Sequence, residues 1–293
     1  MKLNKLGRVL IVGVNSKIGG ALYKDLQKYA ISVLGTTRKK NVALGDPRII
    51  YLDLKDEVID EGLLPEVDIV YIMASVTSMA ECVSDSDSYG INVSRISQIG
   101  SLYMKRGSFI IFASTNAVFS GEKFEQNECD IVDPITIYGS QKRDAENALL
   151  NSAALIPKGR LAIVRMTKVL THDITLIKDW TASILDGRPI EAFIDLKISP
   201  ISLRYVLICL KMIGEQKCEG IFHLSGSADI SYYELALQLT RRCGGRGDQV
   251  LKRMSSKAGV LAPSFSSLGM SRTKTVLGIE PENLEQCLEY FFQ

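Results

Sequence analysis

A phenol and an ammonium lie four residues apart in the segment Tyr138-Gly-Ser-Gln-Lys142, a spacing that puts both side chains on one face of a helix. A tyrosine with an ordinary pKa near 10 is a poor acid–base catalyst at neutral pH. An adjacent ammonium and a positively charged cofactor ring would together stabilise the phenolate, and a drop of about three units in this pKa corresponds to roughly 4 kcal/mol. Tyr51 and Lys55 repeat the spacing, but they straddle the predicted end of a strand and share no face. We therefore predict Tyr138 and Lys142 as the acid–base pair.

A hydroxyl that could work with Tyr138 stands at the end of an apolar run. The run Phe109–Ala113 is followed directly by Ser114 and Thr115. Ligands of open α/β sheets bind at the carboxyl ends of the strands, where these two side chains would lie. Thr115 is thus predicted to hold a substrate oxygen against Tyr138 while a cofactor delivers hydride.

Short, mostly β-branched runs recur through the first two thirds of the chain and do not alternate with polar residues. Continuous runs of this kind predict strands that are buried on both faces, as in a parallel sheet. Segments with helical spacing separate them, which predicts an α/β fold with a Rossmann-like, doubly wound parallel sheet. The predicted strands are 9–12, 31–35, 49–52, 69–73, 109–113 and 161–166.

The pattern changes after Arg165, where helix-like stretches dominate. Helices are predicted at 174–185, 203–213 and 232–243, with one clear strand at 221–224, and Ser231 and Glu234 predict a capping box. We expect a smaller C-terminal substrate lobe laid over the sheet edge. The predicted division is a cofactor-binding part of residues 1–165, to which 198–225 return, and a lobe of residues 166–197 and 226–293.

The first strand runs into Gly13-Val-Asn-Ser-Lys-Ile-Gly19-Gly20, where a helix begins. Glycines at such a turn let backbone N–H groups approach a pyrophosphate at the positive end of the helix. The usual fingerprint has a glycine where this chain has Ser16, so the hydroxyl must turn away from the phosphates or bond to them. An ordinary tight turn would look similar, but the position at the first strand favours dinucleotide binding.

The second strand ends in Thr36-Thr37-Arg38-Lys39-Lys40, without the acidic residue that binds the ribose of NAD. Basic side chains here suit the 2′-phosphate of NADPH, although a solvated loop is the alternative. Asp53 at the end of the third strand is expected to bind the adenine amino group or to cap the next helix. Ala74 and Ser75 are small residues where a cofactor would pass close to the backbone.

The composition is that of a globular protein, with 46% hydrophobic and 23% charged residues. A net charge of +2 gives no bulk attraction to nucleic acid or anionic membranes. The six cysteines form no C-x-x-C pair, and two histidines are too few for a typical zinc site. No apolar stretch approaches a membrane span or a signal-peptide core. We expect a cytoplasmic protein without a metal, nucleic-acid partner or membrane partner, and the sequence leaves a homodimer open.

The motifs resemble those of extended short-chain dehydrogenases/reductases, and they occur in the same order along nearly the whole chain. Within that family they are most similar to the dTDP-4-dehydrorhamnose reductase branch. The matching segments are Gly13–Gly20, Asp53-Leu54, 69–75, Asn92-Val93, Ser114-Thr115, Val118-Phe119, Gly121, Tyr138-Gly139, Lys142, Glu146, Arg165, 199–201, 220–226, 231–236, Pro263 and Ser267-Leu268.

This resemblance implies a role for each matching residue. Tyr138 would donate the proton, Lys142 would modulate its pKa and contact the ribose, and Asn92 would join a water relay to that lysine. The implied NADP site comprises Gly13, Asn15, Ser16, Lys17, Ile18, Gly19, Thr37, Arg38, Asp53, Leu54, Ala74, Ser75, Asn92, Tyr138 and Lys142. The implied substrate contacts are Ser114, Thr115, Asn116 and Arg165, of which Arg165 could equally form a structural ion pair, while His223 is expected in the core.

Two departures from the family pattern bear on function. Ser16 replaces a glycine, and Asn116 stands where rhamnose reductases usually have an aspartate. Dehydratases of sugar nucleotides carry an Asp-Glu pair after the hydroxyl, so Asn116-Ala117 argues against that reaction.

Three functions fit these residues. The first is an NADPH-dependent reductase of a keto group on a nucleotide-linked deoxysugar; the others are an epimerase and a non-catalytic NADP-binding regulator. A reductase requires an open cleft of about 300–1,000 Å³ above Thr115 and Tyr138. Lys168 is a second cation for the substrate diphosphate, and Trp180 is expected in the lobe core rather than stacked on the base.

Overall fold

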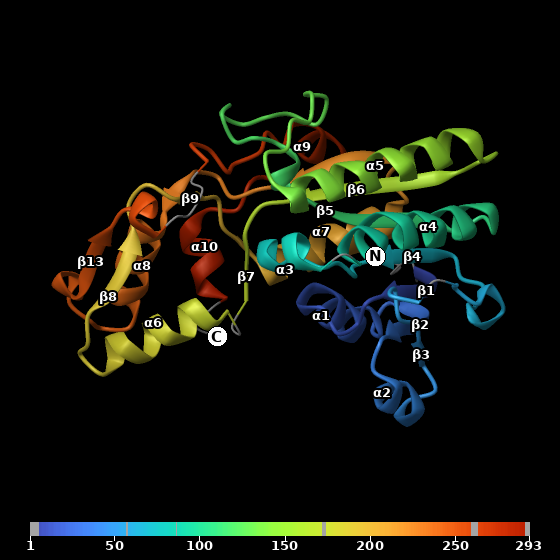
Figure 1. Ribbon diagram of the computed structural model, residues 1–293, viewed down its shortest axis with the longest axis horizontal. Helices are drawn as coiled ribbons and strands as arrows, with labels where there is room; N and C mark the ends of the chain where they lie inside the picture. The colour runs from blue at the N-terminus through green and yellow to red at the C-terminus, as the bar shows by residue number, and fades with distance from the viewer. Residues whose placement is uncertain (1–5, 57, 86, 172–173, 259–262, 291–293) are drawn as a thin grey trace.

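A seven-stranded parallel sheet forms the centre of the molecule (Figure 1). The computed structural model describes residues 6–56, 58–85, 87–171, 174–258 and 263–290. The strand order is β11-β6-β5-β4-β1-β2-β3, so the chain winds outward from β1 in both directions. The strands are β1 (Leu6–Val12), β2 (Ala30–Thr37), β3 (Ile49–Tyr51), β4 (Ile69–Ile72), β5 (Phe109–Thr115), β6 (Arg160–Met166) and β11 (Gly220–Leu224). All six predicted strands are present, and the predicted doubly wound sheet is confirmed.

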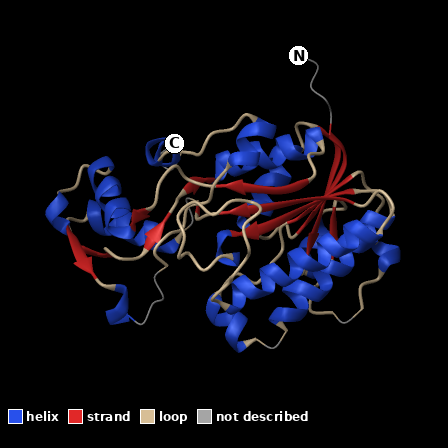
Figure 2. Cartoon of the chain, turned by 90° about the horizontal axis from the view of Figure 1, so that it is seen from above, coloured by secondary structure: helices blue, strands red, loops and turns tan. Residues whose placement is uncertain are grey.

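Helices cover both faces of the sheet (Figure 2). Alternate residues of one strand enter opposite cores: Ile69 and Tyr71 pack with the α1 and α7 side, and Val70 and Ile72 with the α4 and α5 side. This two-sided burial is why the strands are continuously apolar. The helices that follow the strands are α1 (Lys17–Leu26), α2 (Lys40–Gly45), α3 (Met79–Ser84), α4 (Ile96–Lys105), α5 (Ile137–Leu155) and α7 (Leu203–Gln216).

A smaller lobe follows β6 and has its own apolar core around Trp180, which is buried and packs edge-to-face on Tyr232. Its helices are α6 (Thr175–Leu185), α8 (Tyr232–Arg242) and α10 (Leu284–Glu289), and the capping box at Ser231 is present. The sequence interpretation missed its short strands, of which β8 (Ile190–Phe193) pairs in parallel with β13 (Val250–Arg253). Two-residue strands β7 (Val169–Leu170), β9 (Lys197–Ile198), β10 (Ile201–Ser202) and β12 (Ile230–Ser231) join the lobe to the sheet edge.

One helix of the predicted lobe segment packs on the sheet instead. Helix α9 (Ser271–Leu277) lies beside β11, where the Thr273 hydroxyl donates to the carbonyl of His223 over 2.7 Å. Within the described residues, no helix combines the length and apolar character needed to cross a membrane.

The contact between α4 and α5 predicts a stability difference along α5. Leu149 is fully buried, and a Cβ added at Gly100 of α4 would meet its Cδ2 at 2.2 Å, so the helices pack closely there. Leu149→Ala should lower the free energy of unfolding by about 2–5 kcal/mol through lost burial and a cavity. The matched variant Leu155→Ala, at a position 83% exposed, should change it by less than about 0.5 kcal/mol. Urea unfolding of both variants checks this, and equal midpoints would contradict the packing.

Candidate active site

Thr115 and Tyr138 line the same cleft, although 22 residues of chain separate them. Thr115 ends β5 and caps a short turn, with its Oγ1 accepting from the N–H of Ala117 over 3.1 Å. Helix α5 (Ile137–Leu155) follows the N-cap Thr136, two residues before Tyr138. Its first turn lies directly on the β5 loop, because a Cβ at Gly139 would come within 2.0 Å of the Ala117 carbonyl oxygen. Glycine at 139 thus allows the approach that brings the phenol to the end of β5.

The environment of Tyr138 favours its protonated form. Burial, with a smaller contribution from the neighbouring Cys82, raises the pKa of the phenol to about 12, and the Ser75 hydroxyl opposes the shift. Lys142 is not among the groups that shift this pKa, and the lowering expected from the lysine together with a cofactor stays a prediction. A protonated phenol suits a proton donor in a reduction.

Lys142 lies beneath the site rather than on its surface. Its ammonium donates to the Ala113 carbonyl over 2.5 Å and sits 4.1 Å from the centre of the Phe112 ring. Burial lowers the pKa of Lys142 to about 7, although the Glu146 carboxylate acts in the opposite direction. The lysine therefore fixes the end of β5, and it lines neither of the two pockets described below.

Arg165 and Ser114, predicted as substrate contacts, both bond to Glu146, and for Arg165 the alternative of a structural ion pair is the arrangement present. Arg165 is 3% exposed and forms an ion pair with the buried Glu146, at 2.7 Å from Nη2 to Oε2 and 3.1 Å from Nε to Oε1. The Ser114 hydroxyl donates to the same carboxylate. His223, a core residue as expected, lies 3.4 Å from the guanidinium, and burial followed by the Arg165 charge lowers its pKa to about 3. The side chains of Arg165 and Ser114 are thus bonded inside the protein, and neither lines the cleft.

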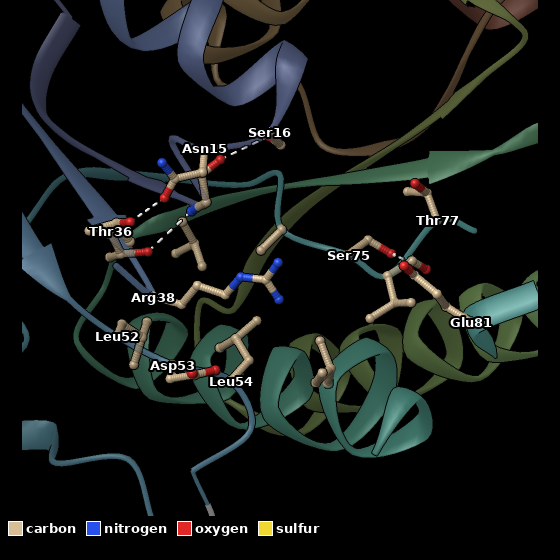
Figure 3. A pocket seen from close by; sticks show the side chains of 16 residues that line it. Asn15, Ser16, Thr36, Arg38, Leu52, Asp53, Leu54, Ser75, Thr77 and Glu81 are labelled. Carbon is tan, nitrogen blue, oxygen red and sulfur yellow. Dashed lines mark hydrogen bonds between the residues drawn. The ribbon is translucent and has the colours of Figure 1, made fainter. Parts of the chain in front are cut away.

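A pocket of about 250 Å³ opens at the ends of β1, β2 and β4 (Figure 3). The glycine turn forms one wall. Gly13 has φ +94°, and a Cβ there would lie 2.8 Å from Ala74, so the turn requires glycine. The residues predicted for the cofactor that line the pocket are Gly13, Asn15, Ser16, Thr37, Arg38, Asp53, Leu54, Ala74 and Ser75.

Ser16 is an N-cap in this turn. Its hydroxyl donates to the Gly13 carbonyl over 2.8 Å and accepts from the N–H of Gly19 over 3.0 Å. The hydroxyl is therefore satisfied within the turn, which resolves how a serine fits at the glycine position. Gly19 is buried behind this hydroxyl, and Ile18 packs on the sheet core. Three residues predicted for the cofactor therefore do not line the pocket: Lys17, Ile18 and Gly19.

The basic loop contributes one cation to the pocket. Figure 3 shows Arg38 extending from the end of β2 into it, with Asn15 bonded to the Thr37 hydroxyl nearby. Asp53 accepts from the N–H of Lys55 over 3.0 Å and caps a turn rather than a helix. The lining residues that were not predicted are Val12, Thr36, Leu52, Val76, Thr77, Glu81 and Ile91. Thr36 stands in the quoted end of the second strand, whereas Thr77, Glu81 and Ile91 belong to no recognised motif.

Asn92 is fully buried and lies outside the pocket lining, contrary to its predicted place. It stands in a π-helical turn, Gly90–Arg95, and accepts from the Ser75 hydroxyl over 2.9 Å and from the N–H of Val76 over 2.8 Å. Its amide donates to the Gln141 side chain over 2.7 Å. Asn92 thus joins the end of β4 to α5 without contacting Lys142.

The cleft that contains Thr115 and Tyr138 measures about 840 Å³ and lies between the sheet edge and the lobe. Its walls are mostly apolar, and among the described residues that line it the ionisable side chains other than Tyr138 and Tyr232 are two lysines, Lys123 and Lys168, with no carboxylate. Partial desolvation lowers the pKa of Lys168, whose side chain still reaches solvent, and the neighbouring Lys17 lowers it further. Thr77 lines both this cleft and the smaller pocket, so the two cavities adjoin.

Asn116 and Trp180 are the remaining residues whose positions were predicted. Asn116 lines the cleft, but its amide is bonded to Ser266. Trp180 is buried in the lobe core, as expected, and Tyr232 is the aromatic residue of this pair that reaches the cleft.

Comparisons with known proteins agree with this architecture. The chain is 23% identical over 305 residues to dTDP-4-dehydrorhamnose reductase of Aggregatibacter actinomycetemcomitans, covering 97% of the chain and 98% of that protein. It is 24% identical over 243 residues to methionine adenosyltransferase 2 subunit beta of Xenopus laevis, covering 78% and 70%.

Solved structures share the fold. The dTDP-4-dehydrorhamnose reductase of Bacillus anthracis, in complex with NADP, matches with a TM-score of 0.82 at 20% identity, over 97% of this chain and 98% of that one. The UDP-glucose 4-epimerase of Thermotoga maritima, with UDP-glucose, matches with a TM-score of 0.81 at 19% identity, over 97% and 98%. The family model described as "RmlD substrate binding domain" matches residues 7–293. The resemblance drawn from the motifs is thereby confirmed, and the chain belongs to the RmlD substrate-binding-domain family.

Proposed function

We propose that this protein is an NADPH-dependent reductase of a keto group on a nucleotide-linked deoxysugar. One observation carries the proposal: Thr115 and Tyr138 line an open cleft that adjoins the glycine-turn pocket at Thr77. Its volume, about 840 Å³, falls in the range of small-molecule sites. The cofactor-binding part would comprise residues 1–165 and 198–225, and the substrate lobe residues 166–197 and 226–293 except α9, which packs beside β11.

The smaller pocket fits a dinucleotide phosphate. Gly13 keeps space that a side chain would fill, and Arg38 supplies a fork of donors suited to a 2′-phosphate. A structural relative was crystallised with NADP. NADPH, when bound, supplies the hydride for carbonyl reduction.

The protein's own residues supply the proton and the geometry. Tyr138, protonated at neutral pH, donates to the developing alkoxide, and the Thr115 hydroxyl orients the carbonyl oxygen. Lys142 acts from beneath by holding the end of β5. Within the part of the chain that the structure describes, Lys123 and Lys168 give the cleft two cations and no carboxylate, a charge balance that favours a diphosphate.

The two alternatives make different use of the same residues. An epimerase would return the hydride to its product, so that no net NADPH is consumed. A regulator, as suggested by the relatives named methionine adenosyltransferase 2 subunit beta, would need the cofactor pocket and no substrate cleft. The open cleft with Thr115 and Tyr138 supports the reductase over the regulator.

Cofactor choice is the first test. NADPH should bind at least tenfold more tightly than NADH, a difference of about 1.4 kcal/mol, because Arg38 faces the pocket. Arg38→Ala should remove most of this preference, whereas Arg188→Ala, in an exposed ion pair with Asp186, should leave it intact. Calorimetric titration with both cofactors measures it, and equal affinities in the wild-type chain would refute the assignment.

Proton donation is the second test. Tyr138→Phe should lower kcat at least about a hundredfold and keep NADPH affinity, since a positioned acid is lost and the ring remains. Tyr51→Phe, in the other Tyr-x-x-x-Lys segment, serves as the matched control and should keep full activity. Lys142→Met should lower turnover, because the ammonium that holds the end of β5 at the Ala113 carbonyl is lost. Steady-state kinetics with a dTDP-linked 4-keto-6-deoxyhexose measures these effects, and full activity of Tyr138→Phe would sink the assignment.

A further inference from the structure

Residues 265–268 form the roof of the substrate cleft, and all four line it. The lobe holds this roof segment through Asp229, whose carboxylate accepts from the N–H of Ser266 over 2.7 Å and from the N–H and hydroxyl of Ser267 over 2.8 and 2.6 Å. On the opposite side, the N–H of Phe265 donates to the Gly121 carbonyl over 2.9 Å. The roof segment is thus fixed from both the lobe and the sheet.

Asn116 is the side chain that ties this roof to the reacting end of the cleft. Its Nδ2 donates to the Ser266 carbonyl over 3.1 Å and to the Ser266 Oγ over 3.0 Å. Its Oδ1 accepts from the Thr115 hydroxyl over 3.4 Å, a long bond that leaves the hydroxyl free to turn toward a substrate. One amide therefore joins the orienting hydroxyl to the roof.

The chemistry at Ser266 selects an amide at position 116. The Ser266 N–H is already given to Asp229, so the backbone offers Asn116 only a carbonyl, which requires a donor. A carboxylate at 116 could still accept from the Ser266 hydroxyl, but it would oppose the Ser266 carbonyl oxygen with a second acceptor and would draw the Thr115 proton more strongly. The asparagine that departs from the family pattern is thus matched to this roof.

We propose that Asn116 is a positioning residue that closes the roof segment over the sugar and so sets the affinity for the sugar nucleotide, without contacting the cofactor. This rests on the proposed function, because it assumes that the cleft holds a nucleotide sugar. Asn116 lines the cleft but lies outside the glycine-turn pocket, so the NADPH contacts proposed in that pocket do not involve it.

The test compares Asn116→Asp with Asn116→Ala, and Asn147→Asp, at an exposed position of α5, is the matched control. We expect Asn116→Asp to raise KM for a dTDP-linked 4-keto-6-deoxyhexose at least tenfold, and more than Asn116→Ala does, with kcat less affected. NADPH affinity should stay within twofold in all three variants. Amide hydrogen exchange of residues 265–268, measured without substrate, should be faster in Asn116→Asp than in the wild type.

The order of the KM values of the two variants separates a positioning role from a packing role. Aspartate keeps the shape of asparagine and loses its donor, whereas alanine loses both. If Asn116→Asp behaves like the wild type while Asn116→Ala is impaired, Asn116 only fills space and the proposal is overturned. Unchanged exchange at 265–268 overturns it as well. If the wild-type chain reduces no such sugar nucleotide, the proposed function falls, and the exchange ranking alone then supports or overturns the link between Asn116 and the roof.

Discussion

The buried ion pair between Glu146 and Arg165 is the contact on which the site depends. It joins α5 to β6, and the Ser114 hydroxyl brings β5 to the same carboxylate. Burying two charges costs several kcal/mol per ion, and only close, multiply bonded geometry offsets that cost. Here Arg165 contacts both carboxylate oxygens, and Ser114 adds a further donor. The pair therefore holds together the strand end that carries Thr115 and the helix that carries Tyr138.

The protonation states around the Glu146–Arg165 pair favour a site that donates a proton over one that accepts it. Burial keeps Tyr138 protonated and lowers the pKa of Lys142 to about 7, so the site holds its proton on the phenol. Of the described residues that line the cleft above it, two are lysines and none is a carboxylate. These charges agree with the proposed reduction, which needs an anionic substrate bound and a proton donated.

The sequence predicted the parallel sheet well because two-sided burial leaves a direct signal, the continuous apolar run. It also placed Thr115, Tyr138 and most of the glycine-turn pocket, since these residues follow strand ends or begin helices. Arg165 and Ser114 could not be placed, because an arginine after a strand looks the same whether it faces a ligand or a buried carboxylate. The short strands β8 and β13 were missed because four residues carry little periodicity, and their pairing joins segments about 60 residues apart.

In the proposed reaction, NADPH reduces a ketone that is bound in the two adjoining cavities. The most direct measurement mixes the wild-type protein with limiting NADPH and an excess of a dTDP-linked 4-keto-6-deoxyhexose, following absorbance at the nicotinamide band while the sugar product is quantified. One NADPH oxidised for each hydroxyl formed is the predicted result. Conversion of the sugar without loss of NADPH, or NADPH binding with no conversion across keto sugars linked to dTDP and UDP, would contradict the account.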